Sequence, residues 1–287
     1  MNHISIISDL NTIKTILECS DEEMSREIGV TRMTIDNWRN NEGQITDKHK
    51  EAIYSFAYRK GIRLNRIKEQ LYREDYDRVD NKILFHGTSN VINGEFTLDM
   101  SRERNDFGRG IYCGDSFEQA AMFVATKKQA TVYIVNFDMA YNYKYRQYSV
   151  DLDWMFTIAN CRGRLEYYRD HPRIAELDRN LKDCDFVIAP IADNRMFEII
   201  DEFAEGLITD VQCRHALAST DLGKQYVFLN ENALEGVSIM ADCYLSESEK
   251  NAYKRLREER NRIGIDKSLL ARKDYRGEGL YIDQILK

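Results

Sequence analysis

The hydrophobic pattern of the chain changes near residue 80, and the two sides of this change require different folds. Before it, apolar residues such as Leu10, Ile13 and Leu17 recur every three or four positions, which predicts amphipathic helices. After it, short runs rich in β-branched and aromatic residues alternate with helical stretches. The predicted strands cover residues 83–86, 131–137, 185–189 and 225–229, and the predicted helices cover 116–126, 150–160, 196–205 and 210–219. This mixture predicts an α+β domain over residues 82–245.

The first 70 residues are predicted to form a small all-helical domain. Ser20 and Glu23 have the spacing of a capping box, and Gly29 is typical of a helix end. Thr31 is expected to begin the next helix by capping it. The helices predicted here include 32–39 and 49–60.

Two charged segments flank the α+β domain. Residues 71–81, at the end of a stretch rich in Arg, Lys, Glu and Asp, predict a helical connector. The tail, 246–287, opens with Ser246 and Glu249 in the spacing of a capping box. A charged helix is therefore expected over 250–262.

Charge and cysteine content exclude several classes of protein. The net charge is -7, and because residues 1–70 hold equal numbers of basic and acidic residues, the whole excess of acid lies in the rest of the chain. Such a body is unsuited to generic nucleic-acid binding, which needs clustered cations. The 6 Cys form no CxxC pair, which favours free thiols and gives no metal site. The absence of a long apolar run and the early acidic residues indicate neither a membrane span nor a signal peptide, so a cytoplasmic location is expected.

Two short sequences after the change of pattern carry residues suited to a ligand site. The first, His86-Gly87-Thr88, ends a predicted strand. The second leads into another strand through two glycines, and an aromatic residue follows its tyrosine after eleven positions. Its residues are Asp106, Phe107, Gly108, Arg109, Gly110, Ile111 and Tyr112, and the later aromatic residue is Phe123.

Together these sequences resemble the ADP-ribosyltransferase superfamily, in particular its poly(ADP-ribose) polymerase and diphtheria-toxin-like branch. The order of further segments is similar to a bacterial family of transferase-like domains found in toxin–antitoxin and phage-defence loci. Those segments are 153–160, 186–193 and 225–228, and the resemblance spans 82–240. It implies a split β-sheet core with flanking helices, preceded by the small helical domain and followed by the helical tail.

The resemblance implies that NAD is the substrate and names the residues that bind it. Tyr112 and Phe123 would flank the nicotinamide ring, since a flat aromatic amide suits a slot between two rings. The backbone of Gly87 would hold the amide, because glycine has no Cβ to obstruct it. The remaining NAD-binding residues expected from the resemblance are His86 and Thr88 at the adenosine ribose, Asp106, Gly108, Arg109 and Gly110 in the loop, with Arg109 at the pyrophosphate, and Asp193. Taken singly, each of these residues also suits an ordinary core or turn position.

The sequence departs from the superfamily at the start of a late strand. The superfamily places Glu there, bonded to the ribose hydroxyls, whereas this chain has Gln225. A neutral amide keeps the hydrogen bond but loses the electrostatic part of the stabilisation. Gln225, with His86 and Tyr112, is the predicted catalytic set, and Asp193 or Glu231 is the alternative carboxylate. Residues 160–162 either line the cofactor site or end a helix.

Residues 25–38 resemble the helix-turn-helix of the Cro and phage-repressor family, with Gly29 at the turn. That resemblance implies that Arg32, Met33 and Asn37 meet base edges in a major groove. Asp36 on the same helix and the balanced charge of the segment favour a docking module instead, so DNA is a possible partner but not the expected one.

The resemblances together imply an NAD-dependent ADP-ribosyltransferase that releases nicotinamide. The expected role is an intracellular toxin or anti-phage effector restrained by an antitoxin-like partner. Two alternatives stay open, namely an NAD glycohydrolase and a transcription regulator that senses NAD or ADP-ribose.

Overall fold

The computed structural model of the protein describes residues 6–192, 194–218 and 223–287. The fold is mixed α+β, and its strands form a seven-stranded sheet in the order β4-β5-β6-β2-β1-β3-β7. The strands are β1 (Asn81–Thr88), β2 (Ile111–Gly114), β3 (Thr131–Asp138), β4 (Tyr145–Gln147), β5 (Phe186–Pro190), β6 (Lys224–Phe228) and β7 (Val237–Tyr244). The chain divides into two compact units, each built from three segments. The first unit comprises Met1–Asn93, Phe117–Asn136 and Ile239–Leu256, and the second comprises Gly94–Ser116, Phe137–Ser238 and Arg257–Lys287.

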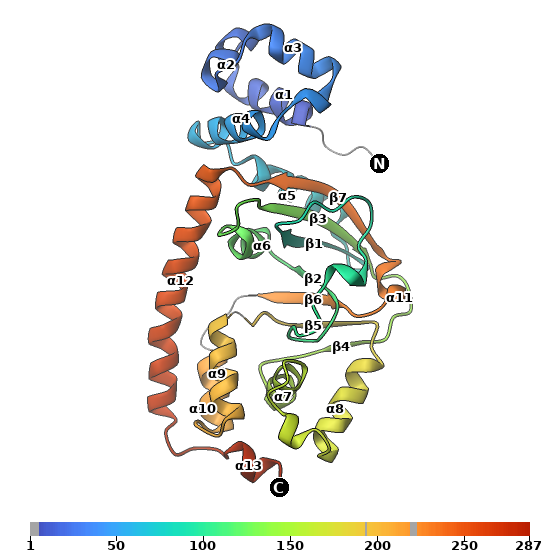
Figure 1. Cartoon of the computed structure of the whole chain (residues 1–287), viewed down its shortest axis with the longest axis vertical. Helices are drawn as coiled ribbons and strands as arrows, with labels where there is room; N and C mark the ends of the chain where they lie inside the picture. The colour runs from blue at the N-terminus through green and yellow to red at the C-terminus, as the bar shows by residue number, and fades with distance from the viewer. Residues whose placement is uncertain (1–5, 193, 219–222) are drawn as a thin grey trace. The chain divides into compact units, whose positions relative to one another are not determined.

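Four helices lie together at the start of the first unit (Figure 1), and their buried side chains form one apolar cluster. They are α1 (Ile6–Leu17), α2 (Asp21–Ile28), α3 (Arg32–Asn40) and α4 (Asp47–Arg59). The predicted caps are confirmed: Ser20 and Glu23 form a capping box, Thr31 caps α3, and Gly29 ends α2 with a φ of 75°. That left-handed conformation favours glycine, which explains why the turn falls there. The interior of the cluster includes Leu10, Ile13, Met24, Ile35, Trp38, Ile53 and Phe56.

A buried ion pair ties the next helix, α5 (Leu64–Tyr76), to the first four. Lys68 Nζ lies 2.6 Å from Asp9 Oδ2, and both side chains are almost fully buried. The Tyr54 hydroxyl donates a hydrogen bond to the same carboxylate. Burial raises the pKa of Asp9, and the positive charge of Lys68 offsets part of this rise. Because an isolated buried charge is costly, α1, α4 and α5 depend on one another.

Strands β1, β3 and β7 and helix α6 (Phe117–Val124) form a second apolar cluster of the first unit. Phe85 and Phe117 meet edge to face, with ring centroids 5.7 Å apart. The predictions of β1, β3 and α6 are confirmed, whereas β7 was not predicted. The cap at Ser246 is confirmed, since its Oγ accepts a hydrogen bond from the Glu249 amide. The helix that follows, α12 (Glu247–Asp274), is longer than the predicted 250–262.

In the second unit, β5 pairs antiparallel with β6, β6 pairs antiparallel with β2, and β4 runs parallel to β5. Its core joins this sheet to α7 (Leu152–Cys161), α8 (Pro172–Lys182), α9 (Asn194–Ala204) and α10 (Asp210–Ala218). Short helices α11 (Glu231–Leu234) and α13 (Ile282–Ile285) complete the unit. The predictions of α7, α9, α10, β5 and β6 are confirmed, whereas α8 and β4 were not predicted. Trp154 and Phe203 are fully buried in this core.

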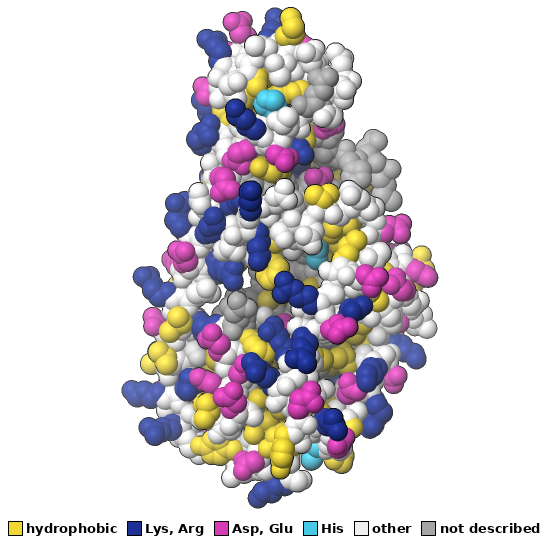
Figure 2. Space-filling model, viewed as in Figure 1, with side chains coloured by type: hydrophobic (Ala, Val, Ile, Leu, Met, Phe, Trp, Pro, Cys, Tyr) yellow, Lys and Arg dark blue, Asp and Glu magenta, His cyan; other side chains and the backbone are white. Residues whose placement is uncertain are grey.

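No helix of the described segments is long and apolar enough to cross a membrane. Over the face shown in Figure 2, basic and acidic side chains are interspersed.

Candidate functional site

The residues predicted to bind NAD are divided between the two units. The first unit carries His86, Gly87, Thr88 and Phe123; the second carries Asp106, Gly108, Arg109, Gly110, Tyr112 and Gln225. Asp193 lies outside the described residues.

In the first unit, Gly87 is required by packing. A Cβ at this position would collide with the Ala120 carbonyl oxygen of α6 and lie 3.1 Å from Val124 Cγ1. The glycine therefore lets α6 approach β1 closely, a role that differs from the predicted contact with nicotinamide. Phe123 extends from the same helix with 67% of its surface exposed. The Thr88 hydroxyl accepts a hydrogen bond from the Asn90 amide at 3.1 Å.

In the second unit, the two glycines that precede β2 have separate structural reasons. Gly108 has a φ of 75°, in the left-handed region that favours glycine. At Gly110, a Cβ would lie 2.7 Å from the Phe228 carbonyl oxygen and 3.0 Å from Val227 Cγ1. β2 therefore approaches β6 closely, in a register that pairs Gly114 with Gln225.

Tyr112 holds the loop before β2 in place. Its hydroxyl donates to the Gly108 carbonyl at 2.8 Å and accepts from the Phe107 amide at 3.0 Å. Burial raises the pKa of Tyr112 well above its ordinary value, so the hydroxyl stays a neutral donor. The sequence predicted the ring of Tyr112 as a wall of the nicotinamide slot and gave no signal for this second role.

Arg109, predicted to meet the pyrophosphate, forms ion pairs within its own loop. Its guanidinium lies 3.3 Å from Asp99 and 3.0 Å from Glu103. Both carboxylates are strongly exposed, so water screens these pairs. These ion pairs therefore contribute little to stability.

A buried polar cluster connects Asp106 to Gln225 and Arg162. Arg162 Nε donates to Asp106 Oδ1 at 2.9 Å, and Gln225 Nε2 approaches Asp106 Oδ2 at 3.4 Å. Gln225 Nε2 also donates to the Pro190 carbonyl at 3.1 Å. Only 7% of Asp106 and 6% of Gln225 are exposed. The Arg162 guanidinium stacks on Phe197, 3.6 Å from the ring centroid.

The charge state of Asp106 is set by two opposing causes. Burial raises the pKa of its carboxyl above the ordinary value, and the Arg162 guanidinium and the hydrogen bond from Gln225 offset only part of this rise. A buried carboxylate with two charge-assisted bonds from one guanidinium is held in a fixed orientation. The cluster therefore gives the second unit a rigid polar centre beside the start of β6.

The position of Glu231 separates it from this cluster. Glu231 is exposed and begins α11, beyond the end of β6 opposite to Gln225. At a rise of about 3.3 Å per strand residue, β6 keeps the two side chains well apart. Among the described residues, Asp106 is the carboxylate that bonds the Gln225 side chain. Among residues 160–162, Arg162 is the one that reaches the cluster.

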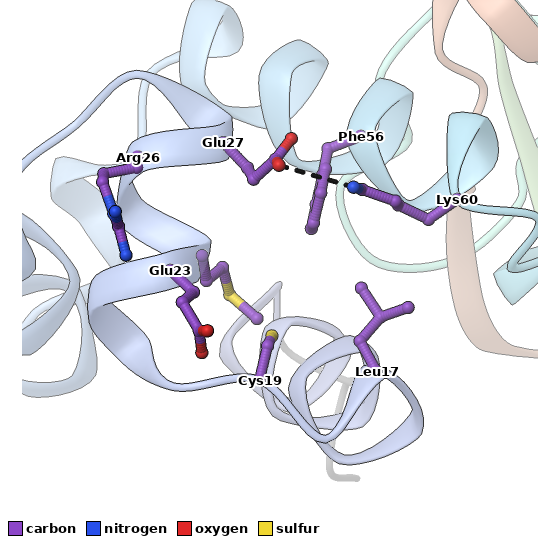
Figure 3. Close-up of a pocket in the computed structure, with 8 residues that line it drawn as sticks. Leu17, Cys19, Glu23, Arg26, Glu27, Phe56 and Lys60 are labelled. Atoms are coloured by element: carbon purple, nitrogen blue, oxygen red, sulfur yellow. Dashed lines mark hydrogen bonds and ion pairs between the residues drawn. The ribbon is translucent and has the colours of Figure 1, made fainter.

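A pocket of about 570 Å³ opens among the helices of the first unit (Figure 3). A 3.4 Å ion pair between Glu27 and Lys60 crosses one side of it. Its lining is formed by Leu17, Cys19, Glu23, Met24, Arg26, Glu27, Phe56 and Lys60. None of the residues predicted to bind NAD belongs to this lining.

No described group of His, Cys, Asp and Glu residues has the composition of a metal site. Neither the curated proteins nor the solved structures contain a match to the chain. One family model, described as "Protein of unknown function (DUF3990)", matches residues 82–238, which is more than half of the chain. The matched segment takes in every residue predicted from the sequence to bind NAD. The chain therefore belongs to the DUF3990 family.

Proposed function

We propose that this protein is an NAD-dependent ADP-ribosyltransferase with the split-sheet fold of that superfamily. In the reaction, the bond between the ribose C1′ and the nicotinamide nitrogen breaks, and its electron pair leaves with neutral nicotinamide. A lone pair of the acceptor forms the new bond to C1′, and the acceptor loses a proton to solvent. The products are nicotinamide, an ADP-ribosylated macromolecule and a proton.

One observation carries the proposal most strongly. The residue at the start of β6 that the resemblance makes catalytic, Gln225, is buried next to a carboxylate, Asp106, which belongs to the loop predicted to bind NAD. A buried carboxylate and amide, paired with a guanidinium that is only partly exposed, are expensive to maintain for packing alone. Such clusters are typical of sites at which a ligand is oriented.

The remaining roles follow the resemblance. Tyr112 and Phe123 contact the nicotinamide, Gly87 bonds its amide through the backbone, and His86 and Thr88 bond the adenosine ribose. Arg109 binds the pyrophosphate by leaving Asp99 and Glu103. The resemblance also assigns Gly108, Gly110 and Asp193 to the NAD site, together with Asp106 in the loop that carries them.

The proposal places the protein in the cytoplasm as a toxin or anti-phage effector, with an antitoxin-like partner. In this proposal the helix-turn-helix-like segment is a docking module. The ion pairs of α3 support this assignment, since Asp36 lies 3.0 Å from Arg39 and 3.9 Å from Arg32. Both arginines of the helix are thus close to an acid that phosphate would have to displace.

The test is to incubate the full-length protein with NAD labelled in its adenosine part, with and without cell lysate. Label that becomes covalently attached to protein or nucleic acid, together with released nicotinamide, is the expected result. Release of free ADP-ribose at the same rate in both samples would identify a glycohydrolase instead. The absence of nicotinamide release and of NAD binding by calorimetry would exclude both enzymes.

A further inference from the structure

We infer that Asp106 is a positioning residue for Gln225, and that the two side chains together do the work of the carboxylate expected at the start of β6. The inference rests on the proposed function. Gln225 touches the nicotinamide ribose, and Asp106 acts through Gln225 by fixing and polarising its amide. Neither Asp193 nor Glu231 is needed for this role.

The neighbours of the Gln225 amide determine which of its ends faces a ligand. Nε2 lies 3.4 Å from Asp106 Oδ2 and 3.1 Å from the Pro190 carbonyl oxygen. A carboxylate and a carbonyl only accept hydrogen bonds, so the amide nitrogen has to face both of them. Both Nε2 hydrogens are then used, and no described residue donates a hydrogen bond to Oε1. Oε1 is therefore the acceptor for a ribose hydroxyl, as a carboxylate oxygen would be.

Asp106 also alters the amide electronically. Arg162 bonds Asp106 Oδ1, whereas Asp106 Oδ2 faces the Gln225 amide. The amide nitrogen therefore lies next to the negatively charged partner of the ion pair. A carboxylate that accepts from Nε2 draws electron density toward Oε1 and strengthens that oxygen as an acceptor. This polarised oxygen can stabilise positive charge that develops on the ribose carbon.

The same geometry explains why a glutamate is unsuitable at this position. A glutamate at position 225 would place a carboxylate oxygen where the Gln225 amide nitrogen now donates a hydrogen bond to Asp106. The neighbouring cation is Arg162, which already bonds the other oxygen of Asp106. Two such carboxylates cannot both stay ionised without a large cost. We therefore expect Gln225→Glu, which restores the superfamily residue, to impair the enzyme.

The experiment is a charge swap in the full-length protein, read as the rate of nicotinamide release at varied NAD concentration. Asp106→Asn is expected to lower kcat by about 10²-fold while KM changes by less than about threefold. Gln225→Glu is expected to lower kcat near pH 8 and to recover as the pH falls, because one of the paired carboxyls takes up a proton. Within the part of the chain that the structure describes, Arg162, Tyr112 and Cys161 are the other titratable groups that interact with Asp106, and none of them is substituted in these variants.

The double variant Asp106→Asn/Gln225→Glu exchanges the carboxylate and the amide and so restores their hydrogen bond. Its kcat is expected to exceed that of either single variant by at least about tenfold. Asp170→Asn, an exposed carboxylate of the same unit, is the matched control and should behave as the wild type. Gln225→Glu leaves the Asp106–Arg162 pair intact, so it gives a reading even if Asp106→Asn does not fold.

The outcomes separate the two claims. A wild type that neither binds NAD nor releases nicotinamide overturns the proposed function, and with it this inference. An active wild type whose kcat is unchanged by Asp106→Asn overturns the positioning role alone. A double variant no better than the single variants does the same, since a merely structural Asp106 would show no such rescue.

Discussion

Tyr112 combines an aromatic face with a hydroxyl that holds its own loop. The hydroxyl joins the Phe107 amide to the Gly108 carbonyl, and Gly108 is the residue with positive φ in that loop. A loop fixed in this way carries Asp106 at a constant position. The ring and the hydroxyl can be separated by substitution, because phenylalanine keeps the first and removes the second.

We predict that Tyr112→Phe lowers the free energy of unfolding by about 1–2 kcal/mol, because the Phe107 amide loses its partner. NAD affinity should change little, since the ring remains. Tyr112→Ala should in addition weaken NAD binding by roughly 1–3 kcal/mol. Urea denaturation and calorimetry measure the two effects. Unchanged NAD affinity in a folded Tyr112→Ala variant would contradict the slot assignment.

Glu249 in the first unit is a buried carboxyl that no proposed function uses. Its Oε2 accepts a hydrogen bond from Asn65 Nδ2 at 2.9 Å, and only 6% of the residue is exposed. Burial raises its pKa from 4.5 to about 7. In the unfolded chain the carboxyl ionises near its ordinary pKa. At a pH between the unfolded and folded pKa values, the chain therefore takes up a proton when it folds. Stability from this group is therefore present at low pH and lost as the pH rises through about 7.

We predict that Glu249→Gln removes this loss while it keeps an oxygen for Asn65. The free energy of unfolding of the variant, minus that of the wild type, should rise by roughly 2 kcal/mol between about pH 5 and pH 8. Urea denaturation at both pH values measures the change. Glu258→Gln, at an exposed position of α12, is the control. If the difference in the free energy of unfolding did not vary with pH, folding would not raise the pKa of Glu249.

At the scale of elements, the sequence predicts helix ends correctly where a few neighbouring residues determine the cap or turn. The caps at Ser20, Thr31 and Ser246 and the turn at Gly29 needed only neighbouring residues, and all four are confirmed. α8 was missed although Ile174, Leu177 and Leu181 mark its buried face at helical spacing. β4 has three residues and pairs with β5 along one edge only, so it leaves almost no periodicity.

The candidate site was predictable in its residues but not in its contacts. The sequence motifs predict both Asp106 and Gln225 as site residues, yet 119 positions separate them. Their hydrogen bond depends on the pairing of β2 with β6, which no local pattern specifies. Arg162 and Phe197 enter the cluster for the same reason, through the packing of α7 and α9 on the sheet of their unit. Tertiary contacts of this kind are set by the whole core.

Helix α3 allows a test of the docking assignment. Met33 is 72% exposed, but Arg32 and Arg39 lie near Asp36, and Arg39 also bonds Asp21 at 2.7 Å. We predict that the full-length protein binds DNA only weakly, with a dissociation constant above about 10⁻⁶ M and a steep dependence on salt. Fluorescence anisotropy with DNA duplexes of random sequence measures this affinity.

Asp36→Asn should tighten that binding several-fold without adding sequence preference, because it removes the acid beside both arginines. Asp47→Asn, an exposed acid at the start of α4, is the control. A nanomolar, sequence-specific footprint of the wild type at physiological salt would overturn the docking assignment and favour a transcription regulator.

At the scale of the whole chain, the first unit joins segments that are far apart in sequence. Glu51 of α4 accepts hydrogen bonds from the Tyr244 hydroxyl at 2.9 Å and from the Glu247 amide at 3.0 Å. Asn65 of α5 donates to the Tyr244 carbonyl as well as to Glu249. The N-terminal helices are thus bonded to the end of β7 and the start of α12. Cooperative units of this kind unfold together.

Removal of the N-terminal helices should therefore destabilise the strands of the same unit. Asn65→Ala should lower the free energy of unfolding by about 2–3 kcal/mol, because it leaves the Glu249 carboxylate and the Tyr244 carbonyl without their donor. Asn251→Ala, at an exposed position of α12, should change it by less than about 0.5 kcal/mol. Deletion of residues 1–70 removes Asn65, Lys68 and Glu51 together, and we expect it to abolish the cooperative thermal transition of the first unit. If the deleted chain instead melted cooperatively at the wild-type temperature, residues 1–70 would be an independent domain, and their bonds to β7 and α12 would contribute little to stability.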